Sequence, residues 1–467
     1  MSAGNCPGSS WNAPHWLKSW PVLAAAAMLP AALLPALEVA RGGGGLWNDF
    51  ATYWLAGKLV SAGATPYDID ALVRLGAQEG VVFEAGTGFS YPLPFAVAMV
   101  TLAALPFTLA ASLFTAASII VFGLAVAGWL RDGVTWRSGP GGTFLAALAI
   151  GAYPPVPGSV LFGQANLLVF AVLALGIRGA LYGWGQRTLA GGGWIGLAGI
   201  VKLVPLALFV PLALARRTGA VLGLLGAAMG AMLAAWVVAP AALAGSEHLI
   251  ALGSPDAFWS NQSLNGYASR LTLGNDRVVA ALPQVDPAPL GTALLITLAI
   301  ATLAGLLRAR QAVGTTSGVA LAIGLTLVAA TAAAPKNSLW NHVPALIGAG
   351  LLLAPIHGSG ALRPLERALT LAWYGLAVFG LWFDSLGMVQ GLGPVGSVLS
   401  GAPLVGVLAL WAALGSCLLR LDQGSGDSSA QCVDPLRGEE RRGGTRHRER
   451  KTVRWPRVTR TRRVRKV

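Results

Sequence analysis

The chain has 467 residues, of which 55% are apolar and only 11% are charged, whereas soluble domains carry about 25% charged residues. This composition excludes a soluble globular enzyme and a disordered protein, and the presence of only three cysteines excludes a disulfide scaffold. Repeated apolar runs of about 18 residues or more predict an all-α polytopic integral membrane protein.

The net charge of +14 is concentrated at the C-terminus. Residues 420–467 contain 15 Lys and Arg against 6 Asp and Glu, which accounts for +9 of the total. We therefore predict a cytoplasmic N-terminus over residues 1–19 and a basic, disordered cytoplasmic tail over residues 421–467 that faces anionic membrane lipids. A solvated tail that only fixes topology is the simpler alternative. Nucleic acid is not an expected partner, because the rest of the chain belongs in lipid.

Between these ends, residues 20–420 are predicted to form one transmembrane domain with roughly 10–13 helices. The apolar segments fall near residues 20–40, 93–110, 112–130, 143–157, 166–183, 193–214, 219–244, 290–308, 316–334, 341–356, 366–383 and 397–419. Two long polar stretches, 41–92 and 245–289, separate them.

Arginines in the short loops set the expected orientation. Because Lys and Arg accumulate in cytoplasmic loops, the pairs at 216–217, 308–310 and 363–367 place both long polar stretches on the extracytoplasmic side. Strict alternation, however, would put the loops that carry Arg131 and Arg178 outside. A re-entrant hairpin at 193–214 or at 93–130 would bring them inside, and the sequence leaves this choice open.

The stretch 41–92 carries a helical pattern of its own. Apolar residues recur at helical spacing from Trp47 to Leu59, which predicts an amphipathic helix in the membrane interface. Asn48 or Asp49 is its expected N-cap, and Asp49 shares a helix face with Tyr53. Asp49 is therefore either a cap, or a general base beside the headgroup zone where a lipid-linked substrate would react. The two roles are compatible.

A second short helix is expected to follow Asp68 and Asp70 and to run to about Gln78. The Asp-Ile-Asp spacing is also that of a metal-binding pair, but turn and helix-start chemistry explains both acids more simply. We expect neither a metal ion nor a cofactor.

Several polar residues interrupt the apolar segments farther along the chain. Lys202, at membrane depth, either snorkels to an interface or binds a phosphate. Gln164 and Asn166 bind sugar hydroxyls or satisfy a turn, and Arg270 is suited to clamp a phosphate. His342 is either structural or touches a leaving phosphate.

Taken in order, these residues resemble glycosyltransferase family 87, a family of C-type integral-membrane glycosyltransferases. The resemblance covers about residues 20–385. The motifs that carry it are Asp49 with Tyr53, Pro66-Tyr67-Asp68, Phe89-Ser90-Tyr91-Pro92, Gly163-Gln164-Ala165-Asn166, Lys202-Leu203-Val204-Pro205, Asn261-Gln262-Ser263-Leu264-Asn265-Gly266 with Arg270, and Leu339-Trp340-Asn341-His342.

The resemblance implies a polyprenyl-phosphate-linked sugar as donor and a lipid-linked glycan as acceptor, joined on the outer face of the inner (plasma) membrane. It implies that Asp49 is the catalytic base and that Lys202, Arg270 and His342 hold the donor phosphate. The substrate-binding residues would be Tyr53, Tyr91, Gln164, Asn166, Asn261 and Gln262.

The chain departs from the family pattern at two motifs. It has Tyr91-Pro92-Leu93 where members commonly have Tyr-Pro-Pro. It has Trp340-Asn341-His342-Val343 where members often have a second histidine, so a role that needs a histidine pair is not expected.

The residues and the resemblance leave three functions open, besides a catalytically silent scaffold for envelope synthesis, against which an intact Asp49 argues. The first is an inverting mannosyltransferase that builds envelope glycolipids, and the second is an arabinofuranosyltransferase that uses the analogous donor. The third, a flippase or transporter for a lipid-linked sugar, is disfavoured because the chain has no evident internal repeat.

Overall fold

The structure is a computed structural model, and it describes residues 19–42, 45–81, 88–132, 140–183, 185–247, 249, 254–353, 362–385, 389 and 391–427. The N-terminal segment and most of the basic tail, which the sequence predicts to be cytoplasmic, lie outside these ranges. The pattern of internal contacts divides the chain into two units, Met1–Gln423 and Gly424–Val467, and the first unit contains the helical domain.

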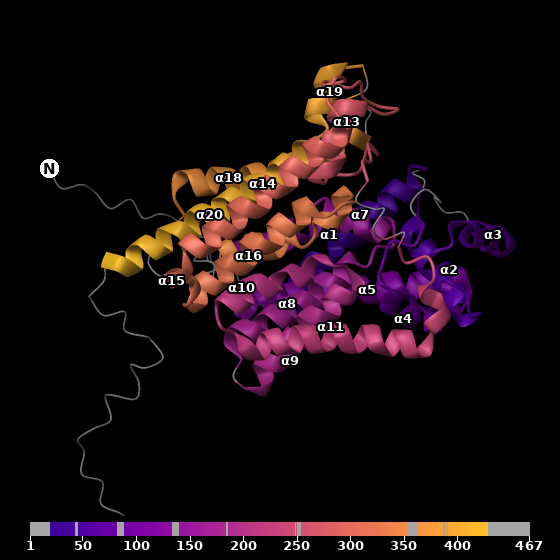
Figure 1. Ribbon diagram of the computed structural model, residues 1–467, viewed down its shortest axis with the longest axis horizontal. Helices are drawn as coiled ribbons and strands as arrows, with labels where there is room; N and C mark the ends of the chain where they lie inside the picture. The colour runs from indigo at the N-terminus through magenta and orange to yellow at the C-terminus, as the bar shows by residue number, and fades with distance from the viewer. Residues whose placement is uncertain are drawn as a thin grey trace, which may run out of the picture. The chain divides into compact units, whose positions relative to one another are not determined.

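Within the described ranges the chain is helical, and its only strand-like pairing is one isolated bridge between Asn261 and Ser338 (Figure 1). Six helices are long and apolar enough to span a membrane: α1 (Trp20–Ala40), α5 (Phe107–Asp132), α11 (Thr218–Val238), α14 (Pro287–Arg308), α16 (Thr316–Ala333) and α20 (Ala402–Asp427). A bent pair, α6 (Pro140–Ala152) and α7 (Pro155–Leu161), gives a seventh span if counted as one. This confirms the predicted all-α polytopic membrane protein.

This count includes only helices of at least 18 residues among the described parts of the chain, and four further apolar segments form shorter helices. These are α4 (Leu93–Ala103), α8 (Asn166–Tyr182), the pair η3 (Val204–Leu208) and α10 (Phe209–Leu214), and the pair η5 (Leu339–His342) and α17 (Ala345–Leu353). The remaining elements are α2 (Asn48–Ser61), α3 (Ile69–Glu79), α9 (Gln186–Val201), η4 (Pro240–Leu243), α13 (Leu264–Leu273), α15 (Arg310–Val313), α18 (Pro364–Ser385) and α19 (Pro394–Leu399).

The apolar segment 193–214 does not cross as one helix. The helix α9 ends at Val201, Lys202 has an extended backbone, and Pro205 lies in η3, where its ring prevents continuation of the helix. The helices α8 and α9 pack antiparallel, because Gly176 lies against Ile195 and Gly179 against Gly191. The sequence offered two candidate re-entrant hairpins, 193–214 and 93–130. The segment 193–214 turns back at Lys202. The other breaks too, between α4 and α5.

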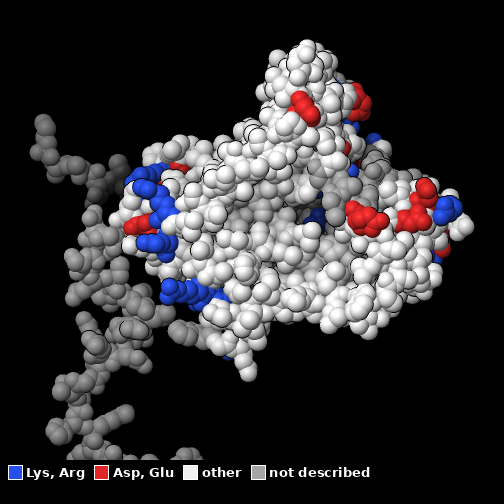
Figure 2. Space-filling view, in the orientation of Figure 1, with Lys and Arg blue, Asp and Glu red and all other residues white. Residues whose placement is uncertain are grey.

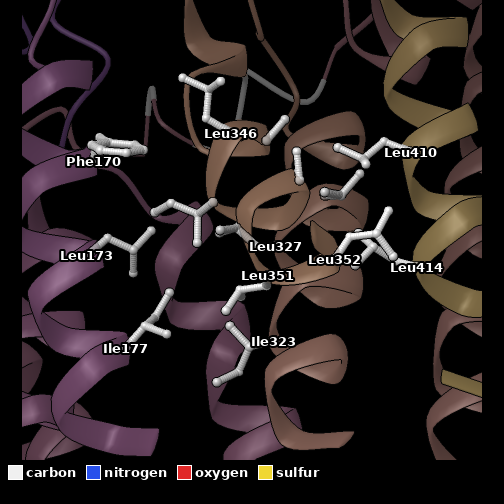
Figure 3. Close-up of a cluster of buried hydrophobic side chains, with 14 of the residues drawn as sticks. Phe170, Leu173, Ile177, Ile323, Leu327, Leu346, Leu351, Leu352, Leu410 and Leu414 are labelled. Carbon is white, nitrogen blue, oxygen red and sulfur yellow. The ribbon is translucent and has the colours of Figure 1, made fainter. Parts of the chain in front are cut away.

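The largest core lies between α8, α16, α17 and α20. Figure 3 shows its aliphatic side chains meeting from these helices, with Leu173 and Ile177 of α8 on one side and Leu410 and Leu414 of α20 on the other. Helices pack closely elsewhere through small residues. A Cβ on Gly192 of α9 would lie 1.9 Å from the carbonyl oxygen of Ala220 in α11, so only glycine allows this approach.

The helix α2 forms where the sequence predicts it, but it does not lie on the surface. Ten of its residues are buried. Aromatic contacts explain this, since Phe50 packs against Phe107 and Phe114 of α5, and Trp54 donates a hydrogen bond to the carbonyl of Leu105. The helix itself is confirmed. The prediction that it has one apolar face and one solvent-facing polar face is wrong, because protein covers both faces of α2.

Candidate active site

The side chain of Gln164 is the centre of a polar network where α2, α8 and α9 meet. Its amide nitrogen donates a hydrogen bond to Oδ2 of Asp49 at 2.5 Å. Its amide oxygen accepts hydrogen bonds from Tyr53 at 3.1 Å, Tyr91 at 3.2 Å and Lys202 Nζ at 3.1 Å. One amide group therefore holds an acid on one side and a cation on the other.

Asp49 lies in the first turn of α2 but does not cap the helix. The N-cap position is Trp47, with a left-handed backbone and no side-chain cap. Carbonyls from the turn after α7 take over the capping, because Trp47 N donates to Leu161 O at 2.8 Å and Asp49 N donates to Phe162 O at 3.0 Å. The predicted N-cap role of Asn48 or Asp49 is therefore wrong, and the Asp49 carboxylate reaches Gln164 instead.

The turn that carries Gln164 requires glycine. Gly163 has φ +67°, a conformation that other residues adopt at a cost. A Cβ at this position would also lie 2.7 Å from the Cβ of Phe50. Gly163 thus lets the turn approach α2 closely enough for the next side chain to meet Asp49.

Lys202 occupies the break between α9 and η3, outside the candidate membrane-spanning helices. Its Nζ donates to Asn341 Oδ1 at 2.6 Å and lies 5.5 Å from the centre of the Tyr91 ring. Burial lowers the pKa of Lys202 to about 7, and the negative charge of Asp49 partly opposes this shift. The sequence left two roles open for Lys202, phosphate binding and snorkelling to an interface. The side chain points into the polar network, where it contacts Gln164 and Asn341.

Asn166 and Asn341 extend the network toward η5. Asn166 is fully buried, and its Nδ2 donates to Trp340 O at 2.8 Å, to Ser159 Oγ at 3.0 Å and to Asn341 Oδ1 at 3.1 Å. Ser159 and Asn341 are not among the predicted site residues. Asn341 lies in the motif Leu339-Trp340-Asn341-His342, but the sequence analysis selected the neighbouring His342 from that motif instead.

Two tyrosines close the network on the side of α2 and α4. Their hydroxyl oxygens are 2.6 Å apart, and burial raises the pKa of both Tyr53 and Tyr91 well above that of an exposed phenol. The charge of Asp49 raises both pKa values further. Both hydroxyls therefore keep their protons at neutral pH and act as hydrogen-bond donors.

One side of the network is open. Asp49, Tyr91, Lys202 and Asn341 are each partly exposed, whereas Gln164 beneath them is buried. Figure 2 shows a hollow in one face of the first unit, with a basic side chain at its bottom. The acid and the cation are thus available to a ligand.

Arg270 belongs to a second, buried cluster built by α13, α19 and the segment before η5. Its guanidinium is fully buried and donates to Ser400 Oγ at 2.9 Å, to Phe258 O at 3.1 Å and to Asn261 O. Figure 1 shows α13 and α19 side by side. This geometry suits a residue that holds a loop together, and these three contacts all lie outside the network around Lys202, so the predicted phosphate role of Arg270 stays a prediction.

The other predicted residues of this cluster are also buried. Asn261 accepts a hydrogen bond from the backbone of Asn337 at 3.1 Å, and Gln262 donates to Ser400 O at 2.9 Å. His342 Nε2 lies 3.3 Å from Gln262 O, while its Nδ1 has no partner within the described residues. The segment 335–342 joins the two clusters, because Trp340 and Asn341 face Asn166 and the residues on either side of them face the loop at 261.

The second short helix begins as predicted. Asp68 caps α3 by accepting a hydrogen bond from Ala71 N at 2.9 Å. Across the part of the chain that the structure describes, no three His, Cys, Asp or Glu side chains lie together as a metal site.

Comparison with known proteins identifies a family. The model of glycosyltransferase family 87 matches residues 89–335, more than half of the chain. This region contains Tyr91, Gln164, Asn166, Lys202, Asn261, Gln262 and Arg270, but not Asp49, Tyr53 or His342. No curated protein and no solved structure matches the chain. The polar network is therefore the candidate active site of a membrane glycosyltransferase, and the chain belongs to glycosyltransferase family 87.

Proposed function

We propose that the protein is an inverting glycosyltransferase that moves a sugar, in our expectation mannose, from a polyprenyl-phosphate donor to a lipid-linked glycan acceptor. Transfer would take place on the outer face of the inner membrane. The observation that carries the proposal is the pairing of Asp49 and Lys202 on opposite ends of the Gln164 amide. An inverting displacement needs a base on one side of the anomeric carbon and a cation on the other.

In this proposal Asp49 accepts the proton of the acceptor hydroxyl as its oxygen attacks the anomeric carbon. The bond from that carbon to the donor phosphate breaks, and polyprenyl phosphate leaves with additional negative charge. Lys202 stabilises this charge as it develops. Gln164, which contacts both groups, sets the distance between them.

The polar groups around this pair suit a sugar. Asn341 and Tyr91 border the open face and present an amide and a hydroxyl group of the kind that bind sugar hydroxyls, while Tyr53 is fully buried behind Tyr91. Asn166 is enclosed behind Asn341, so we assign it the orientation of Asn341 and of the Trp340 backbone. Arg270, Asn261, Gln262 and His342 are assigned to support of the loop that borders the site.

The test is Asp49→Asn in proteoliposomes supplied with polyprenyl-phosphate mannose or its arabinose analogue. Asn preserves the size and the hydrogen bonding of the side chain but takes up no proton. We expect the transfer rate to fall about 100-fold or more, with donor binding nearly unchanged.

Asp70→Asn, at an exposed position in the first turn of α3, is the matched control and should transfer at the normal rate. Transfer by Asp49→Asn at the wild-type rate would remove Asp49 from the mechanism. Transfer of neither sugar by the wild type, with an acceptor present, would contradict the proposed donor class.

A further inference from the structure

A groove separate from the polar network lies between α1, α5 and α8, with Leu351 of α17 at its edge. Its volume is about 510 Å³, within the range of roughly 300–1,000 Å³ that is common for ligand sites. Most of its wall is aliphatic, and small residues open its floor: Ala125, Gly128, Ala171 and Ala174. Such a wall suits a hydrocarbon chain.

One end of the groove has a different character. Arg178, Trp20 and Tyr182 line it and are all exposed. Trp and Tyr are enriched where a membrane protein meets the headgroup layer, and the planar guanidinium of Arg pairs with phosphate through two hydrogen bonds. The groove therefore combines an apolar channel with a cationic, aromatic mouth.

This mouth lies far from the candidate active site. The helix α8 begins at Asn166, inside the polar network, and Arg178 follows 12 residues later, which is about 18 Å along a helix. A donor phosphate held at Lys202 would not reach Arg178. A ligand whose anionic group lies at the mouth would therefore be distinct from a donor held at Lys202.

We propose that the groove binds one anionic glycerophospholipid, with an acyl chain between α1, α5 and α8 and its phosphate at Arg178. Charge complementarity at the mouth selects the headgroup, and the aliphatic wall accepts the chain. The lipid would connect the first turn of α1, through Trp20, to the end of α8. Its binding is independent of the transfer chemistry proposed above.

The test uses the full-length protein in nanodiscs that contain a photoactivatable phosphatidylglycerol, with phosphatidylcholine of the same chain as comparison. We expect cross-links within residues 121–129 and 171–182, and at least about tenfold weaker capture after Arg178→Gln, because a charge-assisted contact is lost. Arg308→Gln, an exposed arginine at the end of α14 outside the groove, should leave capture unchanged.

A second variant tests the channel itself. Ala125→Trp fills the groove and should reduce capture, whereas Ala117→Trp, on an exposed part of the same helix, should not. Equal capture of the two lipids, or capture that Arg178→Gln leaves intact, would overturn the proposal. Displacement of phosphatidylglycerol by polyprenyl phosphate would also overturn it, because the groove would then belong to the donor chain.

Discussion

Lys202 gives the candidate site a pH dependence. With a pKa of about 7, this amine is a cation below neutral pH and loses its charge as the pH rises. The proposed donor is a phosphodiester, whose charge is constant in this range. We therefore expect donor affinity to fall about tenfold between pH 6 and pH 8, measured by equilibrium binding to the wild-type protein without acceptor, because the Asp49 charge contributes to the pKa of Lys202.

Lys202→Arg is the control for this effect, since a guanidinium keeps its charge throughout. Its donor affinity should be nearly constant between pH 6 and pH 8. A wild-type affinity that does not change with pH, or an equal slope in the arginine variant, would show that the charge of Lys202 does not govern binding.

At the scale of single residues, the sequence allowed candidate site residues to be recognised where a polar side chain interrupts an apolar run. Asp49, Gln164 and Lys202 stand out in this way, and the structure brings them together. It could not distinguish them from Arg270, because a polar residue that binds a ligand and one that binds main-chain carbonyls have the same local sequence. Only the folded chain shows which acceptors surround the guanidinium.

At the scale of the elements, substitutions can test whether Arg270 stabilises the loop around α13 while Lys202 binds the donor. Arg270→Met removes the donors that contact Phe258 O, Asn261 O and Ser400 Oγ. Phe258 O keeps the hydrogen bond from Asn261 N at 3.0 Å, but a buried acceptor that loses its donor costs roughly 1–3 kcal/mol. We expect a marked loss of thermal stability, with donor affinity in the folded fraction nearly unchanged. Lys202→Met should show the opposite pattern.

Arg277→Met is the matched control for Arg270→Met, because Arg277 lies in the same polar stretch, 245–289, but is stacked on Trp259, 4.0 Å from the ring centre. It should have little effect on stability. If Arg270→Met kept the normal melting temperature and lost donor affinity, Arg270 would be the phosphate clamp that the sequence suggested.

Helix existence was predictable from apolar periodicity, but the surroundings of a helix were not. The spacing from Trp47 to Leu59 correctly predicted α2, yet the same aromatic residues that suit an interface also suit contacts with α5. The places where apolar segments break were hard to predict for a related reason. Hydropathy alone does not show that Lys202 and Pro205 divide one apolar segment into α9 and a shorter returning piece.

At the scale of the whole molecule, the returning piece bears on the orientation in the membrane. The helix α8 begins in the polar network and α9 ends there, so the turn between them, with Arg178 and Arg187 nearby, lies at the far end of both helices. Figure 2 shows Lys and Arg gathered at the end of the first unit where Figure 1 places α15. If the broken segment α4–α5 crosses the membrane once, the hairpin at Lys202 allows all these arginines to share the predicted cytoplasmic side.

This topology can be tested by cysteine labelling in intact cells, in a variant that lacks Cys6, Cys417 and Cys432. Three exposed positions report on it: Ser61 at the end of α2, Gln186 at the start of α9 and Gln311 in α15. We expect a membrane-impermeant maleimide to label Ser61→Cys in intact cells. It should label Gln186→Cys and Gln311→Cys only after permeabilisation, because both follow the arginine distribution.

Gln186→Cys is the decisive position among the three. Strict alternation of twelve spans would place it outside, whereas the hairpin at Lys202 places it inside with Gln311. Labelling of Gln186→Cys in intact cells, with Gln311→Cys protected, would refute the hairpin, since the two ends of the segment would then lie on opposite sides. Protection of Ser61→Cys in intact cells would refute the proposed outer location of the Asp49 network, because α2 carries both residues.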